Sequence, residues 1–261
     1  MSAALPMPFD VKLMNLAASA LFAIGLALFA AAGAWWAVRH PLFAIAGITV
    51  QGETSHNSVP TLRANVTPQL AGNFFTIDLA AARQAFESVP WVRQAVVKRE
   101  FPNKLRVVVE EHHAVALWGG EGDSRLLGDR GEVFEANVGD VEQDDLPRLA
   151  GPDDQAAQVL AMYQAVKPLF DPLDLGVAQL TLTPRGNWQV ELDNGASVEL
   201  GRGTPAEVAA RTGRFIQTVT QVASRYGRTP EALVSADLRY AEGYALKLRG
   251  VTTTVGDAAK K

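Results

Sequence analysis

The sequence contains no cysteine, and this absence excludes thiolate ligands for a metal ion while fitting both reducing and oxidising compartments. It also has no cluster of lysine and arginine, and its formal net charge is −4 at pH 7. Nucleic acids are bound through concentrated basic charge, so the composition argues against a nucleic-acid ligand. The same balance weakens the case for peripheral binding to anionic lipid.

Catalytic signatures are missing as well. There is no G-x-S-x-G nucleophile elbow, and Gly201-Arg202-Gly203 lacks the third glycine and the Lys-Ser/Thr of a phosphate-binding loop. His112 and His113 resemble a metal pair, but neighbouring strand residues point to opposite faces. The adjacent carboxylates are interpreted as solvated charge: Glu110-Glu111, Asp144-Asp145 and Asp153-Asp154. We therefore expect a binding protein without catalytic residues, cofactor or metal.

One long apolar run is present, from Leu13 to Val38, and it carries no charged side chain. Its core spans roughly 34 Å as a helix, enough to cross the ~30 Å hydrocarbon layer of a bilayer. Trp35 and Trp36 at its end are typical of the aromatic belt at a membrane surface. The sequence predicts a transmembrane helix over residues 15–38, after a short N-terminal segment, residues 1–14.

Two other interpretations of the run are weaker. A cleaved signal peptide has an apolar region of about 7 to 15 residues, shorter than this one, although Ala32-Gly33-Ala34 resembles a cleavage site. A buried soluble helix would show a polar stripe. The charges that flank the run do not decide the orientation of the helix in the membrane, because Lys12 precedes it while Arg39 and His40 follow it.

The chain after this run begins with a small α+β pattern. A β-branched stretch, Phe43 to Gln51, predicts a strand, and a short helical pattern opens at Thr61. Asp78 is the expected N-cap of a second helix that ends before Pro90. Two further strands, joined by a turn over residues 101–104, are expected at Val92–Arg99 and Leu105–Glu111.

The second half predicts mainly strands. Hairpins are expected around residues 128–131 and around Asp193-Asn194-Gly195, a strong hairpin signal. A strand is expected at Val177–Thr183, and apolar residues at helical spacing predict helices at Asp154–Phe170 and Pro205–Tyr226. This favours a mostly antiparallel β-domain with flanking helices.

The last strands carry the functional hypothesis. Val234, Ala236, Leu238 and Tyr240 alternate with polar residues, which indicates one apolar face. After Glu242-Gly243, a final strand from Tyr244 to Arg249 is expected at a sheet edge. An edge strand presents unpaired N–H and C=O groups that a partner can complete by adding a strand.

The residues also resemble a known family. The spacing of Phe74, Pro90-Trp91-Val92, Arg99 to Leu105, Glu111 and Trp118 is similar to the POTRA module of the bacterial FtsQ/DivIB cell-division family. Leu200 to Gly203 and Val234 to Tyr240 resemble motifs of its β-domain. The resemblance implies an α+β protein with one transmembrane helix, a β-α-α-β-β POTRA domain over 43–112, a β-domain over 113–250 and a flexible tail over 251–261.

The resemblance also implies a function. Family members are divisome scaffolds of the inner membrane, with a cytoplasmic N-terminus, a periplasmic bulk and enrichment at the division septum. The β-domain binds FtsB, and through it FtsL, by strand addition, and the POTRA module contacts other division proteins. The expected partner-binding residues are Arg202, Arg239, Tyr240, Gly243, Tyr244, Ala245, Leu246 and Lys247. Glu242, Lys247 and Leu248 depart from residues common in the family.

Alternatives stay open at this stage. Tyr240 could be a core aromatic on the apolar face of its strand, and Arg202 could be a solvated turn residue. A POTRA-bearing translocation or envelope-assembly component would need many lipid-facing strands, for which the remaining length is too short. A membrane-anchored periplasmic hydrolase is a further rival that lacks a catalytic constellation.

Overall fold

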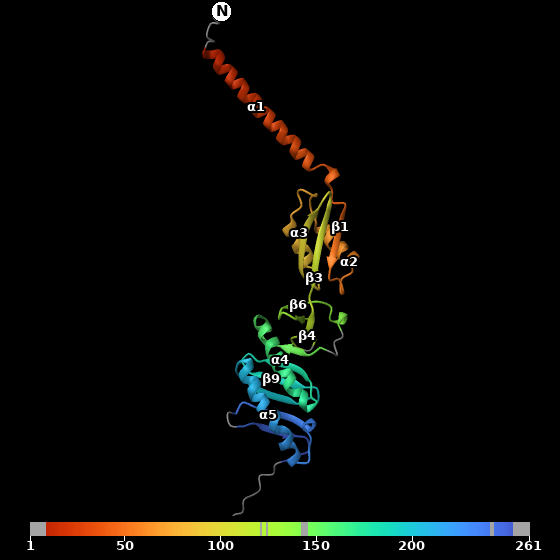
Figure 1. Ribbon diagram of the computed structural model, residues 1–261, viewed down its shortest axis with the longest axis vertical. Helices are drawn as coiled ribbons and strands as arrows, with labels where there is room; N and C mark the ends of the chain where they lie inside the picture. The colour runs from red at the N-terminus through yellow and green to blue at the C-terminus, as the bar shows by residue number, and fades with distance from the viewer. Residues whose placement is uncertain (1–8, 121, 124, 142–145, 241–242, 253–261) are drawn as a thin grey trace, which may run out of the picture. The chain divides into compact units, whose positions relative to one another are not determined.

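The computed structural model describes residues 9–120, 122–123, 125–141, 146–240 and 243–252. The chain divides into two compact units, Met1–Glu111 and His112–Lys261. Each unit has its own sheet and hydrophobic core (Figure 1).

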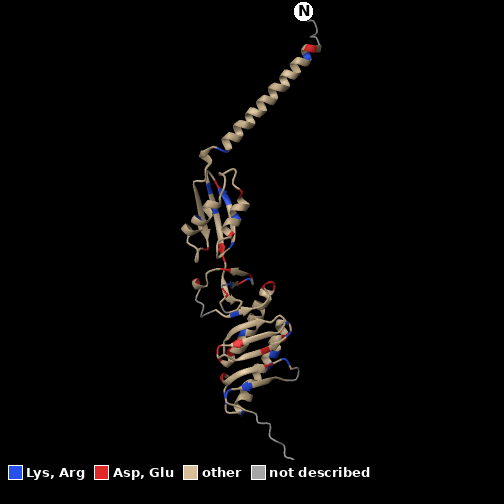
Figure 2. Cartoon of the chain, turned by 180° about the vertical axis from the view of Figure 1, so that it is seen from behind, with Lys and Arg blue, Asp and Glu red and all other residues tan. Residues whose placement is uncertain are grey.

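The first unit begins with helix α1, Phe9–Val38, which is about 45 Å long at 1.5 Å per residue. None of its residues is buried, and its charged side chains lie only at its start (Figure 2). The helix ends at Val38 as expected but begins at Phe9, before the predicted residue 15. Helical hydrogen bonding does not require an apolar side chain, and Asp10 in the first turn suits the positive end of the helix dipole.

The expected strand from Phe43 is shorter than predicted, because β1 is Gly47–Gly52. Pro41 opens a 3-10 turn, Pro41–Phe43, instead. The carbonyl of Phe43 accepts the N–H of Phe74 at 2.8 Å, so this residue pairs away from the sheet. The β-branched run therefore pairs as a strand only after Ala46.

The remaining elements of the first unit follow the predicted order. They are α2 (Val59–Val66), α3 (Leu79–Glu87), β2 (Val92–Glu100) and β3 (Lys104–Glu111). The sheet has the order β1-β3-β2, with β1 parallel and β2 antiparallel to β3. Asp78 caps α3 as expected, accepting the N–H groups of Ala80 and Ala81.

The helices cover one face of this three-stranded sheet. Alternate residues of β3 are buried. Val107 and Val109 pack in one cluster with Phe86 of α3 and Leu62 of α2, and Leu105 packs in a second cluster with Ala82 of α3. The other face remains in solvent, as in antiparallel sheets that bury one side only.

The second unit is built on one nine-stranded sheet. Its strands are β4 (Ala114–Trp118), β5 (Arg125–Gly128), β6 (Val133–Glu135), β7 (Arg148–Ala150), β8 (Val177–Leu182), β9 (Trp188–Leu192), β10 (Ser197–Gly201), β11 (Leu233–Asp237) and β12 (Ala245–Leu248). The spatial order is β12-β11-β10-β9-β8-β7-β4-β5-β6. Both predicted hairpins, β5/β6 and β9/β10, are present, and most neighbours are antiparallel.

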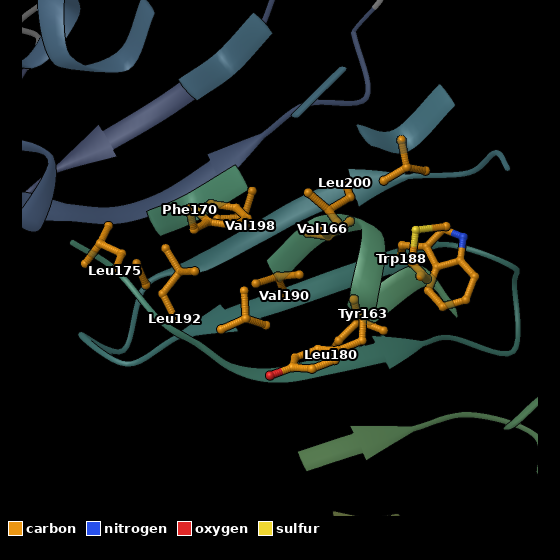
Figure 3. Packing of buried hydrophobic residues seen from close by; sticks show 14 of the residues in the cluster. Tyr163, Val166, Phe170, Leu175, Leu180, Trp188, Val190, Leu192, Val198 and Leu200 are labelled. Atoms are coloured by element: carbon orange, nitrogen blue, oxygen red, sulfur yellow. The ribbon is translucent and has the colours of Figure 1, made fainter. Parts of the chain in front are cut away.

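Two helices, α4 (Ala156–Phe170) and α5 (Pro205–Arg225), pack on this sheet. Helix α4 connects β7 to β8, and α5 connects β10 to β11. The two strands of each pair are parallel neighbours in the sheet, so each helix forms a crossover connection. In Figure 3, Tyr163, Val166 and Phe170 of α4 lie against side chains of β8, β9 and β10. A capping box at Thr204 and Glu207 fixes the start of α5, next to the end of β10.

Candidate partner-binding edge

Strand β12 lies at one end of the nine-stranded sheet, as predicted for the last strand. Within the described part of the chain it pairs only with β11, in an antiparallel register that places Ala245 opposite Asp237 and Lys247 opposite Ser235. One side of β12 therefore has no strand neighbour among these residues. Such an edge offers backbone donors and acceptors to an incoming strand.

The side chains of β12 alternate between two environments. Leu246 is partly buried and Leu248 is buried, both packed on the core of the second unit. Ala245 and Lys247 are exposed on the opposite face. An added strand would thus meet an apolar row on one face and Lys247 on the other.

Tyr244 fastens β12 to α5. Its hydroxyl and that of Thr218 share a hydrogen bond of 2.8 Å, and its ring lies edge-on to Phe215 with centroids 4.9 Å apart. Edge-to-face pairs at this distance are favourable. Tyr244 is therefore a half-buried packing residue, with only part of its surface open to a partner.

Tyr240 is 60% exposed, whereas Leu238 two residues earlier is 1% exposed. The predicted apolar alternation holds at Ala236 and Leu238 but stops there, because β11 ends at Asp237. Beyond that point the chain leaves the sheet, so Tyr240 is not a core residue. Residues 241–242, with Glu242, lie outside the described residues.

Arg239 forms a two-pronged ion pair with Asp237. Its Nε donates to Oδ1 at 2.8 Å and its Nη2 to Oδ2 at 2.6 Å, while its backbone N–H also donates to Oδ1. These hydrogen bonds hold the pKa of Asp237 below its ordinary value, against the opposing effect of partial burial. The guanidinium is thereby held in one orientation with half of its side-chain surface exposed.

A hollow of about 360 Å³ lies between α5 and the segment that connects β11 to β12. We call it the α5 hollow. It brings together three predicted site residues, Tyr240, Gly243 and Tyr244, beside Phe215 and Leu238. The rest of its lining is Thr218, Arg211 and Arg214. The sequence analysis did not predict these two arginines as site residues. Their spacing on one face of the helix was the signal that could have identified them.

Arg202 lies in the turn between β10 and α5. Its Nε donates to Asn187 Oδ1 at 3.2 Å, and its carbonyl accepts from Arg211 Nη2 at 2.8 Å. Gly201 has φ +80°, and a Cβ there would meet the Cγ of Arg239 at 3.0 Å. The glycine therefore allows the turn that carries Arg202 to approach Arg239.

The predicted site residues thus lie around one edge. The connection between β11 and β12 contains Arg239, Tyr240, Gly243 and Tyr244. Strand β12 itself carries Ala245, Leu246 and Lys247. Arg202 lies next to Arg239. Four basic side chains lie there, Arg202, Arg211, Arg214 and Lys247, and they make no ion pair within the described part of the chain, although Glu199 and Asp237 line the same hollow as Lys247.

One predicted solvated carboxylate is buried instead. Glu111 is 2% exposed, and its carboxylate accepts the N–H groups of Ser55, His56 and Asn57 at 2.9 to 3.1 Å. The interpretation of Glu110-Glu111 as surface charge was therefore wrong for Glu111. A loop distant in sequence supplies the donors, and no local pattern reports such a contact.

The other adjacent pairs have structural surroundings where they are described. Asp153 is largely exposed, but it accepts a hydrogen bond of 2.7 Å from the indole of buried Trp118 and pairs with Arg125. Asp144-Asp145 lie outside the described residues. His112 stacks on Phe134, with its Nδ1 3.1 Å from Glu132. The described residues contain no group of three or more His, Asp or Glu side chains placed to hold a metal ion.

Two family models match this chain. Residues 43–112 match the family model of the FtsQ-type POTRA domain, and residues 116–239 match that of the C-terminal part of cell division protein FtsQ/DivIB. The segment from Tyr240 to Lys247 lies just beyond the second match.

Full-length relatives are similar over nearly the whole chain. Cell division protein FtsQ of Burkholderia pseudomallei is 41% identical over 254 residues, covering 97% of this chain and 99% of the relative. The protein of the same name from Bordetella pertussis is 40% identical over 257 residues, covering 92% of each chain. That of Thiomonas arsenitoxydans is 39% identical over 247 residues, covering 94% of this chain and 89% of the relative.

Proposed function

The chain belongs to the FtsQ/DivIB family of bacterial cell-division proteins, and from this premise we propose that it is a non-catalytic scaffold of the divisome. It links early and late division proteins at the septum by binding FtsB, and through it FtsL. Helix α1 spans the inner membrane with the N-terminus in the cytoplasm, and both units after it lie in the periplasm.

The observation that carries the proposal is the free edge of β12 next to the α5 hollow. A partner strand placed along β12 would complete the backbone hydrogen bonds of the edge. Its flanking residues would reach Tyr240, an exposed aromatic of the kind that dominates interface energies. The pairing itself depends little on side-chain identity, so departures such as Lys247 and Leu248 alter its details only.

Charge supports a partner of one kind. The whole chain carries a formal charge of −4, yet Arg202, Arg211, Arg214 and Lys247 surround this edge without ion-pair partners in the described part of the chain. A complementary segment would be acidic, and such pairing raises association rates and fixes register. The resemblance to the family implies that Arg202, in the Gly201-Arg202-Gly203 turn, pairs with an acidic residue of FtsB. FtsB therefore fits this requirement.

The other end of the same sheet is a weaker candidate. Strand β6 also has a free edge among the described residues, but it is three residues long. Short edges give an incoming strand few hydrogen bonds. The POTRA module in the first unit would contact other division proteins.

The test is binding of the full-length protein in nanodiscs to a purified FtsB–FtsL pair from the same bacterium. Tyr240→Lys should weaken binding by roughly thirtyfold or more, the size of an interface hot spot. Because Tyr240 is 60% exposed, thermal unfolding should stay unchanged.

Glu135→Lys, at the exposed last residue of β6, is the matched control and should bind normally. The proposal is wrong if Tyr240→Lys binds like the unaltered protein while Glu135→Lys loses binding. A large drop in unfolding temperature for Tyr240→Lys would instead reveal a structural role for this ring.

A further inference from the structure

Three large apolar side chains are exposed at one end of the first unit. Leu42 is 75% exposed, Phe75 47% and Phe101 84%. Together with half-buried Phe43 we call them the aromatic tip. Exposed apolar side chains are ordinary when scattered, but contiguous ones mark interaction surfaces.

Specific contacts join the segments that form this tip. The ring of Phe43 lies edge-on to that of Phe75, with centroids 4.9 Å apart. Phe75 in turn lies against Phe74, and Phe74 contacts Phe101 at a centroid distance of 6.5 Å. Arg99 holds this loop in place by donating from Nε to the carbonyl of Phe74 at 2.7 Å. Segments some thirty residues apart in sequence thus form one fixed surface.

The tip is also close to the end of the membrane-spanning helix. Residues 39–41 alone separate Val38 from Leu42. At about 3.6 Å per residue, Leu42 lies within roughly 15 Å of the helix end. The side chain of Asn73 donates to the carbonyl of Val38 at 2.6 Å, which brings the loop carrying Phe75 to the same place.

We propose that the aromatic tip inserts into the interfacial layer of the bilayer that α1 spans. Aromatic and leucine side chains enter the boundary between headgroups and acyl chains, with an affinity that grows with the apolar area buried. Exposed Lys104 next to Phe101, and Arg39 over the ring of Trp35 at 4.4 Å, supply cations for lipid phosphates.

Continuity with α1 selects the bilayer over a protein as the occupant. The tip cannot leave the neighbourhood of the membrane surface while α1 remains in the bilayer. Insertion would give the first unit a second point of attachment, so that it could not swing freely about residues 39–41. This inference rests on membrane anchoring by α1 and is independent of the partner that binds β12.

The absence of native cysteine makes the test direct, since each introduced cysteine carries the only label. The full-length protein is reconstituted in vesicles of phosphatidylethanolamine and phosphatidylglycerol that contain a lipid with a nitroxide near the headgroup. A fluorophore at Phe101→Cys should be quenched several-fold more than one at Gln94→Cys, an exposed position nearer the other end of β2. A label at Ala31→Cys, inside α1, reports insertion of the helix.

Matched substitutions test the mechanism. With the label at position 101, Phe75→Ser should lower membrane partitioning of the tip by about tenfold, following the transfer free energy of a phenyl group. Val96→Ser removes an apolar side chain of similar exposure, 41% against 47%, from the open sheet face and should change nothing.

Equal quenching at positions 101 and 94, with position 31 quenched, overturns the proposal. Loss of quenching at position 31 overturns the anchor on which it rests. If quenching at position 101 is present in the protein alone and disappears when other division proteins are added, that result still supports insertion of the aromatic tip into the bilayer in the free protein.

Discussion

At the scale of single residues, the clearest departure from expectation is Glu111, whose buried carboxylate holds the loop that contains Ser55, His56 and Asn57. His56 stacks on Trp91 with centroids 3.9 Å apart and places its Nδ1 3.2 Å from the same carboxylate. One side chain thereby ties the segment between β1 and α2 to the end of β3.

We predict that Glu111→Gln lowers the opening free energy of this loop by about 2–3 kcal/mol. The amide keeps one acceptor oxygen but places an NH₂ group against backbone donors, and a hydrogen bond to a charged group contributes about 1.5–3 kcal/mol. Hydrogen exchange of the amides of residues 55–57 in the full-length protein measures the change.

Glu110→Gln is the matched control, because the Glu110 side chain is 41% exposed and pairs with Arg93 instead of the loop over residues 55–57. It should change the opening free energy of the loop by less than about 1 kcal/mol. Equal effects of the two substitutions would mean that the buried hydrogen bonds of Glu111 do not hold the loop.

A pH dependence is expected at Asp237. Its folded-state pKa is depressed, chiefly by the side-chain hydrogen bond from Arg239. A depressed carboxyl pKa stabilises the folded state above the unfolded value of about 4, and this contribution is lost as the pH falls through the folded value. Asp237→Asn should therefore open β11 more easily at pH 7, with a difference from the unaltered protein that shrinks in acid.

Native-state hydrogen exchange of β11 across this pH range is the measurement. The effect on the opening of β11 will be small, since about half of the Arg239 side chain is exposed and water screens the ion pair. A difference that does not vary with pH would show that Asp237 acts through its shape or packing and not through its charge.

At the scale of elements, the contacts that hold β12 in place determine how available its edge is to a partner strand. Tyr244 immediately precedes β12, and its hydroxyl shares a hydrogen bond with that of Thr218 of α5. We predict that Tyr244→Phe lowers the opening free energy of β12 by about 1 kcal/mol, the usual contribution of one hydrogen bond. Exchange of the β12 amides reports it.

Thr218→Val in the same assay should act like Tyr244→Phe, and the double variant should add little, because both remove one shared bond. Additive losses would contradict a direct link between these hydroxyls.

Local patterns predicted most elements because the signals are themselves local. The alternation at Leu246 and Leu248, the N-cap at Asp78 and the Asn194-Gly195 turn each act over a few residues. The parallel pairing of β7 with β8 and of β10 with β11 was not foreseen. It depends on where α4 and α5 return the chain, which is a tertiary property.

The candidate site was foreseen in part for the same reason. Sequence alternation placed Tyr240 on an apolar face, but the end of β11 at Asp237 releases it to solvent. Arg211 and Arg214 line the α5 hollow only because α5 packs beside Leu238, Tyr240 and Tyr244, which come later in the chain. Side chains brought together by tertiary packing leave no mark in the neighbouring sequence.

At the scale of the whole molecule, functions are divided between the units. The first carries the apolar helix and the POTRA module, while the second carries β12, which has one open side among the described residues, and arginines without ion pairs in that part of the chain. A net charge of −4 concealed this local positive character, since a total says nothing about where charges lie. The scaffold role that we propose would need only such placement of surfaces.

The most direct test of the central claim is site-specific photocrosslinking in dividing cells, with a photoreactive residue at Tyr240 or Lys247 in one strain and at Glu135 in another. We expect an FtsB adduct at both positions of the β12 edge and none at Glu135 on β6. Adducts with FtsB at Glu135 or in the first unit, with none at Tyr240 and Lys247, would contradict docking on β12.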